Sequence, residues 1–123
     1  MAASPAAVAL AQALAQTADN KKAEDIVVLD VSEQHSLIDC FVIATATSDK
    51  HARVVAEVAL EHVKSLGQAP WHLETSPDWV LGDFGDVVIH VFTPQAREYY
   101  DLEHLWADAT RVTWTRAPDA VSA

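Results

Sequence analysis

The sequence contains little glycine, a single cysteine and no long apolar run. Only 3 of its 123 residues are glycine, while half are apolar, which excludes a disordered, collagen-like or linker-rich chain. Cys40 cannot form an internal disulfide and lies in the apolar run Cys-Phe-Val-Ile, so we expect a buried, unreactive thiol. No segment approaches the roughly eighteen apolar residues that a membrane span needs. Because residues 1–16 lack the basic residues of a targeting leader, we expect a cytoplasmic protein.

Basic residues are also scarce. Eight Lys and Arg stand against eighteen Asp and Glu, which gives a formal net charge of −10. Affinity for nucleic acids comes mostly from Lys and Arg that displace counterions from phosphates, so a broad RNA- or DNA-binding face is excluded. A basic protein partner, in contrast, would be attracted to this chain.

The order of predicted elements indicates an α/β fold with a mixed sheet of about five strands flanked by helices. Ser4-Pro5 begins a helix that reaches about residue 19, and a second helix runs from a cap at Ser48 to a stop at Gly67. The runs 26–31 and 40–45 show no polar alternation, which is typical of strands covered on both faces. Residues 71–74 and a hairpin at 79–92 supply the other strands, and Thr93-Pro94 begins a last helix. We divide the chain into an N-terminal helix (1–20), an α/β domain (21–112) and a frayed tail (113–123).

The hairpin carries the most distinctive side chains. If its loop is Phe84-Gly85, Asp83 faces Asp86 and Trp79 faces His90, all on one face with Leu81, because side chains alternate along a strand. Two opposed carboxylates beside an indole are typical of a binding surface for a Lys- or Arg-bearing partner. The alternative is a solvated acidic turn on a surface hairpin, with Trp79 packed on a neighbouring helix.

Residues 79–92, WVLGDFGDVVIHVF, closely resemble the W-x-L-x-D-(Y/F)-G-D-V-V-x-H-x-F signature of the ribosomal silencing factor (Iojap) family. Residues 25–31 with 39–43 resemble the first two strands of that family, and residues 97–106 resemble its closing helix. The resemblance spans residues 21–111. Ala46 and Lys50 depart from it, since the family usually has glycine and arginine there, and Lys cannot make the bidentate contacts of Arg.

The resemblance implies a fold distantly similar to nucleotidyltransferases, no enzymatic activity and no cofactor. It also implies docking on large-subunit ribosomal protein fourteen, a steric block to joining of the small subunit, and lower translation when nutrients run short. Carried over by position, the partner-binding residues are Trp79, Leu81, Asp83, Phe84, Gly85 and Asp86, with His90, Arg97, Tyr99 and Tyr100 as weaker candidates.

Other functions stay open at this point. Asp83 and Asp86 would suit a magnesium ion in a nucleotidyltransferase, but the chain has no Gly-rich phosphate loop. The six histidines show no metal-ligand spacing. A ribosome assembly factor, or a binding module for another basic protein, has the same composition. The aromatic last helix would suit a homodimer interface, whereas its alternative is plain core packing of Tyr99, Tyr100 and Trp106.

Overall fold

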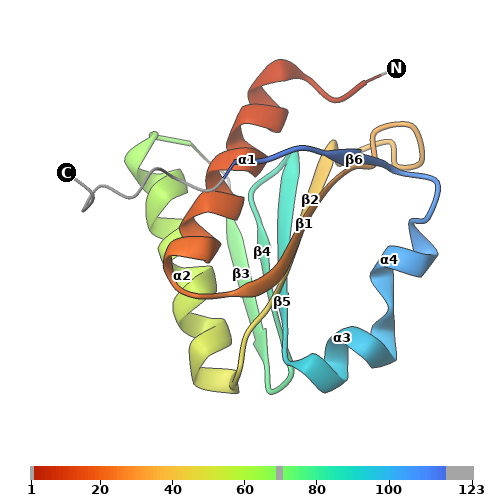
Figure 1. Cartoon of the computed structure of the whole chain (residues 1–123). Helices are drawn as coiled ribbons and strands as arrows, with labels where there is room; N and C mark the ends of the chain where they lie inside the picture. The colour runs from red at the N-terminus through yellow and green to blue at the C-terminus, as the bar shows by residue number, and fades with distance from the viewer. Residues whose placement is uncertain (1, 69–70, 116–123) are drawn as a thin grey trace.

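A six-stranded mixed sheet with helices on both faces forms the fold (Figure 1). The computed structural model describes residues 2–68 and 71–115. The sheet order is β3-β4-β5-β2-β1-β6, in which β2 and β5 are parallel and the other neighbours are antiparallel. In chain order the elements are α1 (Pro5–Asn20), β1 (Glu24–Asp30), β2 (Cys40–Thr45), α2 (Asp49–Ser65), β3 (His72–Ser76), β4 (Trp79–Asp83), β5 (Val87–Phe92), α3 (Pro94–Tyr100), α4 (Leu102–Leu105) and β6 (Thr110–Val112).

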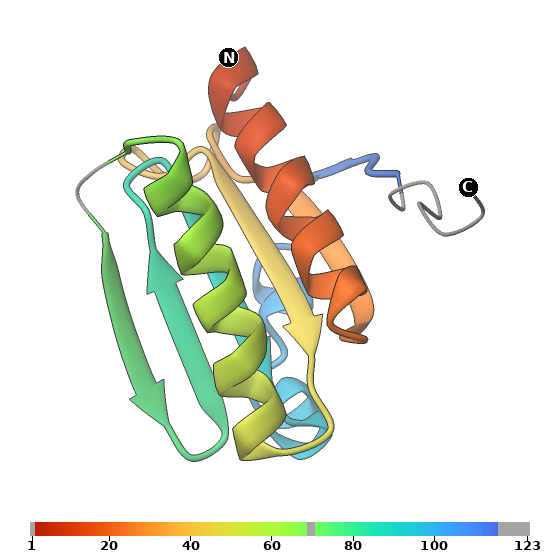
Figure 2. The ribbon, with the colours of Figure 1, turned by 90° about the vertical axis from the view of Figure 1, so that its left-hand side faces the viewer.

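Helices α1 and α2 cover one face of the sheet, where they lie side by side (Figure 2). Both begin at the predicted caps: the Ser4 hydroxyl accepts a hydrogen bond from Ala7 N–H and the Ser48 hydroxyl accepts one from His51 N–H, each at 3.1 Å. Gly67 has φ +71° after the end of α2, the left-handed conformation expected of a helix stop. No helix among the described residues is long and apolar enough to cross a membrane.

Strands β2 and β5 form the centre of the sheet. Every residue of both strands is buried, which confirms that the unalternated apolar run at 40–45 is covered on two faces. Cys40 is fully buried, and burial together with the charges of Asp30 and Asp39 raises the pKa of its thiol to about 12. The thiol therefore stays protonated at neutral pH, as predicted for a small core residue.

The C-terminal part of the fold differs from the prediction in two ways. The last helix is broken into α3 and α4 at Asp101, whose φ of +47° is left-handed and interrupts helical hydrogen bonding. Residues 110–112 then form the sixth strand, which pairs antiparallel with β1. A three-residue edge strand is too short to show a hydrophobic period, so it could not be predicted from the sequence.

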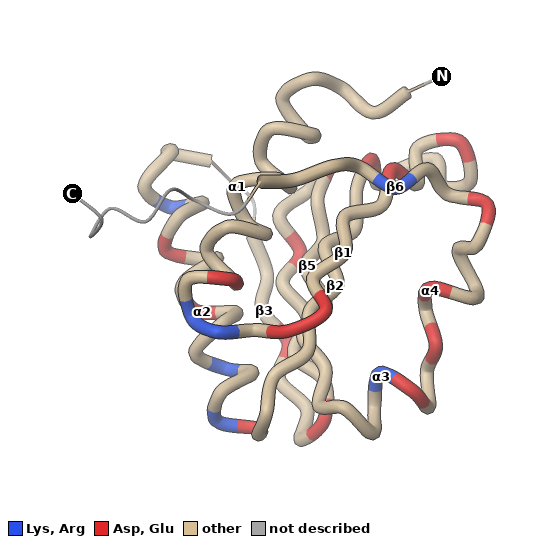
Figure 3. The backbone as a smooth tube through the Cα atoms, viewed as in Figure 1, with Lys and Arg blue, Asp and Glu red and all other residues tan. Residues whose placement is uncertain are grey.

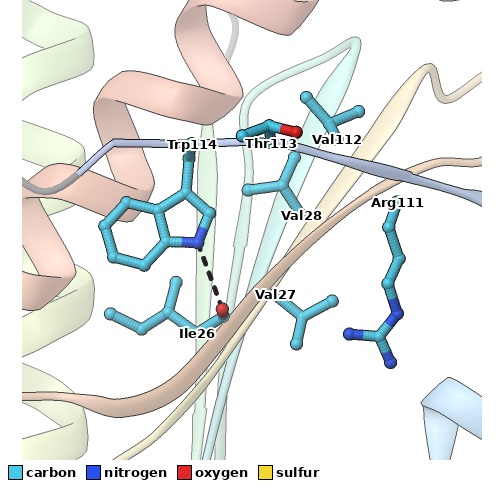
Figure 4. A pocket seen from close by; sticks show the side chains of 7 residues that line it. All are labelled: Ile26, Val27, Val28, Arg111, Val112, Thr113 and Trp114. Carbon is cyan, nitrogen blue, oxygen red and sulfur yellow. Dashed lines mark hydrogen bonds between the residues drawn. The ribbon is translucent and has the colours of Figure 1, made fainter.

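Ordered contacts continue past residue 112, where the sequence predicted a frayed tail. The Trp114 indole N–H donates to the Ile26 carbonyl at 3.2 Å beside a small hollow between β1 and the C-terminal segment (Figure 4). Gln12 and Gln16 of α1 donate to the carbonyls of Thr113 and Thr115 at 2.7 and 2.9 Å. The domain thus extends to at least residue 115, and the rest of the predicted tail, 116–123, lies outside the described residues.

Candidate functional site

The predicted two-residue loop of the β4–β5 hairpin is wrong, because the last paired residues are Asp83 and Val88 and the four residues 84–87 lie between them. Asp83 pairs with Val88 at the base of the loop, and Phe84 N–H donates to the Val87 carbonyl at 2.9 Å. Inside the loop Gly85 has φ +91°, and its N–H donates to Asp83 Oδ1 at 3.0 Å. Both features favour the longer connection, because glycine adopts a positive φ without steric strain and the Asp83 carboxylate satisfies a backbone N–H of the loop.

This register separates residues that the sequence analysis placed together. Trp79, Leu81 and Asp83 still share the face of β4 that points away from α1 and α2. Phe84 instead turns to the opposite side, where its ring is buried in the core beneath the two long helices. Asp86 is exposed beside Phe84, in a hollow of about 190 Å³ that α1 also lines. Asp86 therefore does not face Asp83, and neither Phe84 nor Asp86 adjoins the indole.

The Phe84 ring occupies the space above Gly82. A Cβ at residue 82 would lie 2.8 Å from Phe84 Cζ and 2.9 Å from Ile89 Cγ2. Gly82→Ala is therefore expected to lower the free energy of unfolding by about 2 kcal/mol, the usual cost of overpacking. Denaturant titration measures this loss, and it should shrink when Phe84→Leu is added to the same chain. An undiminished loss in the double variant would show that the Phe84 contact is not its cause.

Trp79 forms the centre of an aromatic cluster on the open face. Its ring centroid lies 4.9 Å from that of Phe92 and 4.7 Å from that of Tyr100. The indole N–H points inward and donates to His90 Nδ1 at 3.2 Å. The side chain is half-buried, so its accessible part is apolar and its polar edge is already satisfied.

His90 lies on the interior side of the Trp79 indole and is not itself accessible to a partner. The residue is 5% exposed, and its ring meets Phe41 edge-on at 4.8 Å. Since Nδ1 accepts from the indole, the neutral ring carries its proton on Nε2, which is buried and has no partner among the described residues. Burial lowers the pKa of His90 to about 4. The predicted pairing of Trp79 with His90 across the hairpin is wrong, because Trp79 pairs with Phe92 and His90 pairs with Leu81. The indole nevertheless reaches the His90 ring from the neighbouring position, so His90 serves to hold Trp79.

Helices α3 and α4 extend the apolar area around Trp79. Tyr99 is 81% exposed and Tyr100 46% exposed on α3, and Leu105 is 72% exposed on α4. Tyr99 and Tyr100 therefore do not pack into the core, the alternative considered from the sequence, whereas Trp106 does pack there, edge-on to Phe41. We define the Trp79 surface as Trp79, Leu81, Tyr99, Tyr100 and Leu105.

Carboxylates border the Trp79 surface, and most of them were not predicted from the sequence. The register of β3 with β4 places Glu74 beside Leu81, while Asp78 and Asp101 line hollows next to Tyr100. Asp83 stands on the same face of β4 as Leu81. The sequence predicted a short strand at residues 71–74, but it did not indicate which strand lies beside Glu74.

Arg97, predicted as a weaker partner-binding residue, is used inside the fold. Its side chain is 13% exposed, and Nε and Nη2 lie 3.0 and 2.9 Å from Glu103 Oε1. Nη1 donates to Thr45 Oγ1 at 2.8 Å and to the carbonyl of Asp25. These contacts tie α3 to α4, to the end of β2 and to the start of β1, so Arg97 stabilises the scaffold on which the tyrosines stand.

The charge distribution leaves the Trp79 surface acidic. Figure 3 shows basic residues on α2, on α3 and at β6. Within residues 2–68 and 71–115, those of the α3 and β6 side are Arg97 and Arg111, and both contact Glu103, Arg111 at 3.6 Å. The same ranges contain no group of three or more His, Cys, Asp or Glu side chains that is arranged to hold a metal ion.

Comparison with known proteins gives a consistent picture. The model of a family described as "Ribosomal silencing factor during starvation" matches residues 4–123. The ribosomal silencing factor RsfS of Bacillus subtilis is 39% identical over 97 residues, which cover 77% of this chain and 82% of that protein. "Mitochondrial assembly of ribosomal large subunit protein 1" of Mus musculus is 34% identical over 91 residues, covering 70% of this chain and 40% of that protein. A crystal structure from Chromobacterium violaceum superposes with a TM-score of 0.76 at 30% identity, covering 94% and 98% of the two chains.

Proposed function

This chain belongs to the ribosomal silencing factor family, and from that premise we propose that it docks on large-subunit ribosomal protein fourteen and thereby blocks joining of the small subunit. Family membership gives it a ribosome-associated silencing role. The specific docking partner and the block to subunit joining are the finer parts of the proposal. Repression would serve to lower translation when nutrients run short.

The Trp79 surface is the observation that carries the proposal. A half-buried indole, two exposed tyrosines and an exposed leucine form a contiguous apolar area beside four carboxylates. Interface hot spots are enriched in tryptophan and tyrosine, and a polar rim surrounds them. An acidic rim suits ribosomal proteins, which are typically basic, because opposite potentials speed association and fix orientation.

The proposed mechanism is steric and requires no bond to be made or broken. A body of 13.4 kDa, bound near the subunit interface, occupies space that the small subunit needs. We propose accordingly that the chain has no catalytic activity. Asp83 and Asp86, the pair considered for a magnesium ion, do not face one another in this fold. Nucleotidyl transfer by the isolated protein in the presence of magnesium would contradict this part of the proposal.

Trp79→Ala is expected to weaken binding to purified large ribosomal subunits by about 30-fold, or about 2 kcal/mol, the loss typical of an aromatic hot spot. Co-sedimentation over a range of subunit concentrations measures the dissociation constant. Trp71→Ala is the matched control, because Trp71 is exposed and packs against Lys64 of α2, at a ring-to-nitrogen distance of 4.5 Å. This control variant should bind within about twofold of the wild type.

The outcome is informative only if Trp79→Ala remains folded, which its far-ultraviolet circular dichroism and thermal transition would establish. Wild-type affinity in a folded Trp79→Ala variant would show that the Trp79 surface is not part of the interface with the large subunit. A second experiment tests the block itself. Addition of the protein to large subunits before small subunits should reduce the yield of joined ribosomes, and Trp79→Ala should restore that yield.

A role in assembly of the large subunit is the second candidate, because the mouse relative is named for that process. Both roles use docking on the large subunit, so the Trp79 surface serves either. Deletion of the gene separates them. Loss of an assembly factor reduces the amount of mature large subunits during growth, whereas loss of a silencing factor leaves that amount unchanged and raises translation during starvation.

A further inference from the structure

We infer that the partner inserts two basic side chains, Lys or Arg, on either side of Tyr100, each between an aromatic ring and a carboxylate. This inference rests on the proposed function, because it takes the Trp79 surface as the docking surface. It adds the chemistry of the partner groups and the two places where they bind.

Two hollows share Tyr100 as a common wall. The first, of about 440 Å³, is lined by Tyr100, Asp101, His104 and Leu105. The second, of about 340 Å³, is lined by Asp78, Gln95, Ala96, Tyr99 and Tyr100. Each hollow therefore combines at least one exposed tyrosine ring with one carboxylate and some apolar surface.

This combination suits a long cationic side chain better than an anion or a purely apolar group. An ammonium or guanidinium group is attracted to the face of an aromatic ring and forms charge-assisted hydrogen bonds with a carboxylate. The methylene stem of Lys or Arg covers apolar atoms at the same time. An anionic group, such as a phosphate of ribosomal RNA, would be repelled by Asp78 and Asp101.

The protein itself leaves these two carboxylates accessible to a partner. Asp101 is exposed, and its ion-pair contact is with the exposed His104, at 3.3 Å. Asp78 is exposed, and its backbone carbonyl, not its side chain, accepts a hydrogen bond from Thr93 N–H at 3.1 Å. Arg97, on the same helix as Tyr100, is committed to Glu103, Thr45 and Asp25 inside the fold. Within residues 2–68 and 71–115, neither Asp78 nor Asp101 forms an ion pair with a Lys or Arg that a basic partner group would have to displace.

The test measures the affinity of purified large ribosomal subunits for charge-neutral variants. Asp78→Asn and Asp101→Asn should each weaken binding about fivefold, and the double variant should weaken it about 25-fold and reduce its dependence on salt. Asparagine tolerates the left-handed backbone of residue 101 about as well as aspartate, so folding should be preserved. The double variant Glu57→Gln with Glu61→Gln removes the same charge from exposed positions on α2. It should bind within about twofold of the wild type.

The ring is tested separately. Tyr100→Leu should weaken binding about tenfold, whereas Tyr100→Phe, which keeps the ring, should stay within about twofold. Tighter binding by the Asp78→Asn, Asp101→Asn double variant would overturn the inference, because it would place an anion such as RNA in the hollows. Unchanged binding by that variant would also overturn it, while loss of binding in Trp79→Ala in the same assay would leave the proposed function standing. If Trp79→Ala bound normally as well, the proposed function itself would fail.

Discussion

Arg97→Ala is expected to lower the free energy of unfolding by about 3 kcal/mol, because it leaves the partly buried Glu103 carboxylate without its main partner and removes the other contacts of the buried guanidinium. The guanidinium also holds Thr45 Oγ1 and the carbonyl of Asp25. Asp25 has φ +48° and lies where the register of β1 with β2 shifts, so the arginine stabilises an unfavourable backbone conformation. One substitution thus removes contacts among α3, α4, β1 and β2.

Urea titration of Arg97→Ala and two matched variants measures this effect. Arg97→Lys keeps the charge but cannot reproduce the several directed N–H donors of arginine, so about half of the loss should remain. Arg111→Ala removes the other, more exposed partner of Glu103, at 3.6 Å, and should cost at most about 1 kcal/mol. A loss in Arg97→Ala no larger than that in Arg111→Ala would contradict a central structural role for Arg97.

Acidification from pH 6.5 to about 4 is expected to cost the folded protein about 3 kcal/mol through His90 alone. Burial lowers the pKa of His90 from 6.5 to about 4. Between these two values the unfolded chain binds a proton at residue 90 and the folded chain does not, so falling pH favours unfolding. Protonation would also occupy the Nδ1 lone pair that accepts the Trp79 N–H, so the folded protein would lose this hydrogen bond.

Unfolding free energies measured at several pH values test this expectation. His90→Asn retains an acceptor near the indole but does not titrate, so the slope between pH 6.5 and 4 should become shallower, although the variant is less stable at pH 7. His72→Asn is the control, because His72 is exposed and its removal should leave the slope unchanged. A wild-type slope in His90→Asn would show that other groups cause the acid sensitivity.

Asp30 contributes to acid unfolding in a different pH range, so its contribution can be separated from that of His90. Burial opposes its ionisation, but hydrogen bonds from the Ser32 hydroxyl and from the N–H groups of Ala3 and Ser32 outweigh burial and lower the pKa of Asp30 below 3.8. A carboxylate with a lowered pKa stabilises the fold above its ordinary pKa, and that stabilisation is lost as the pH falls further. The loss of stability through His90 therefore occurs at higher pH than the loss through Asp30.

Local features were predictable from the sequence alone. Ser4 and Ser48 cap α1 and α2 as predicted, because an N-cap hydrogen bond joins residues only three apart. The unbroken apolar run at 40–45 indicated burial on two faces, since a strand with one solvated face alternates. The same run identified Cys40 as a core thiol. The signature of residues 79–92 identified the family, which the family model confirms.

The arrangement of the site was decided by tertiary structure. Phe84-Gly85 suited a two-residue loop as judged from the sequence, but the register of β4 with β5 leaves residues 84–87 between the last paired residues and moves Asp86 away from Asp83. Arg97 looked accessible on a helix, but its partners Thr45 and Glu103 come from other elements. Tyr100 and Leu105 are exposed on either side of the helix break at Asp101, which the sequence did not predict.

Sequence by itself therefore determined most of the helices and strands, the burial of the central run at 40–45, and the family to which the chain belongs. Only the tertiary structure determined that Trp79, Tyr100, Asp78 and Asp101 meet on one surface and that Phe84 leaves it. The physical reason is the range of the interactions: caps and hydrophobic periods act between residues a few positions apart. Strand register, ion pairs between elements and the covering of a face depend on segments that come together only when the chain folds.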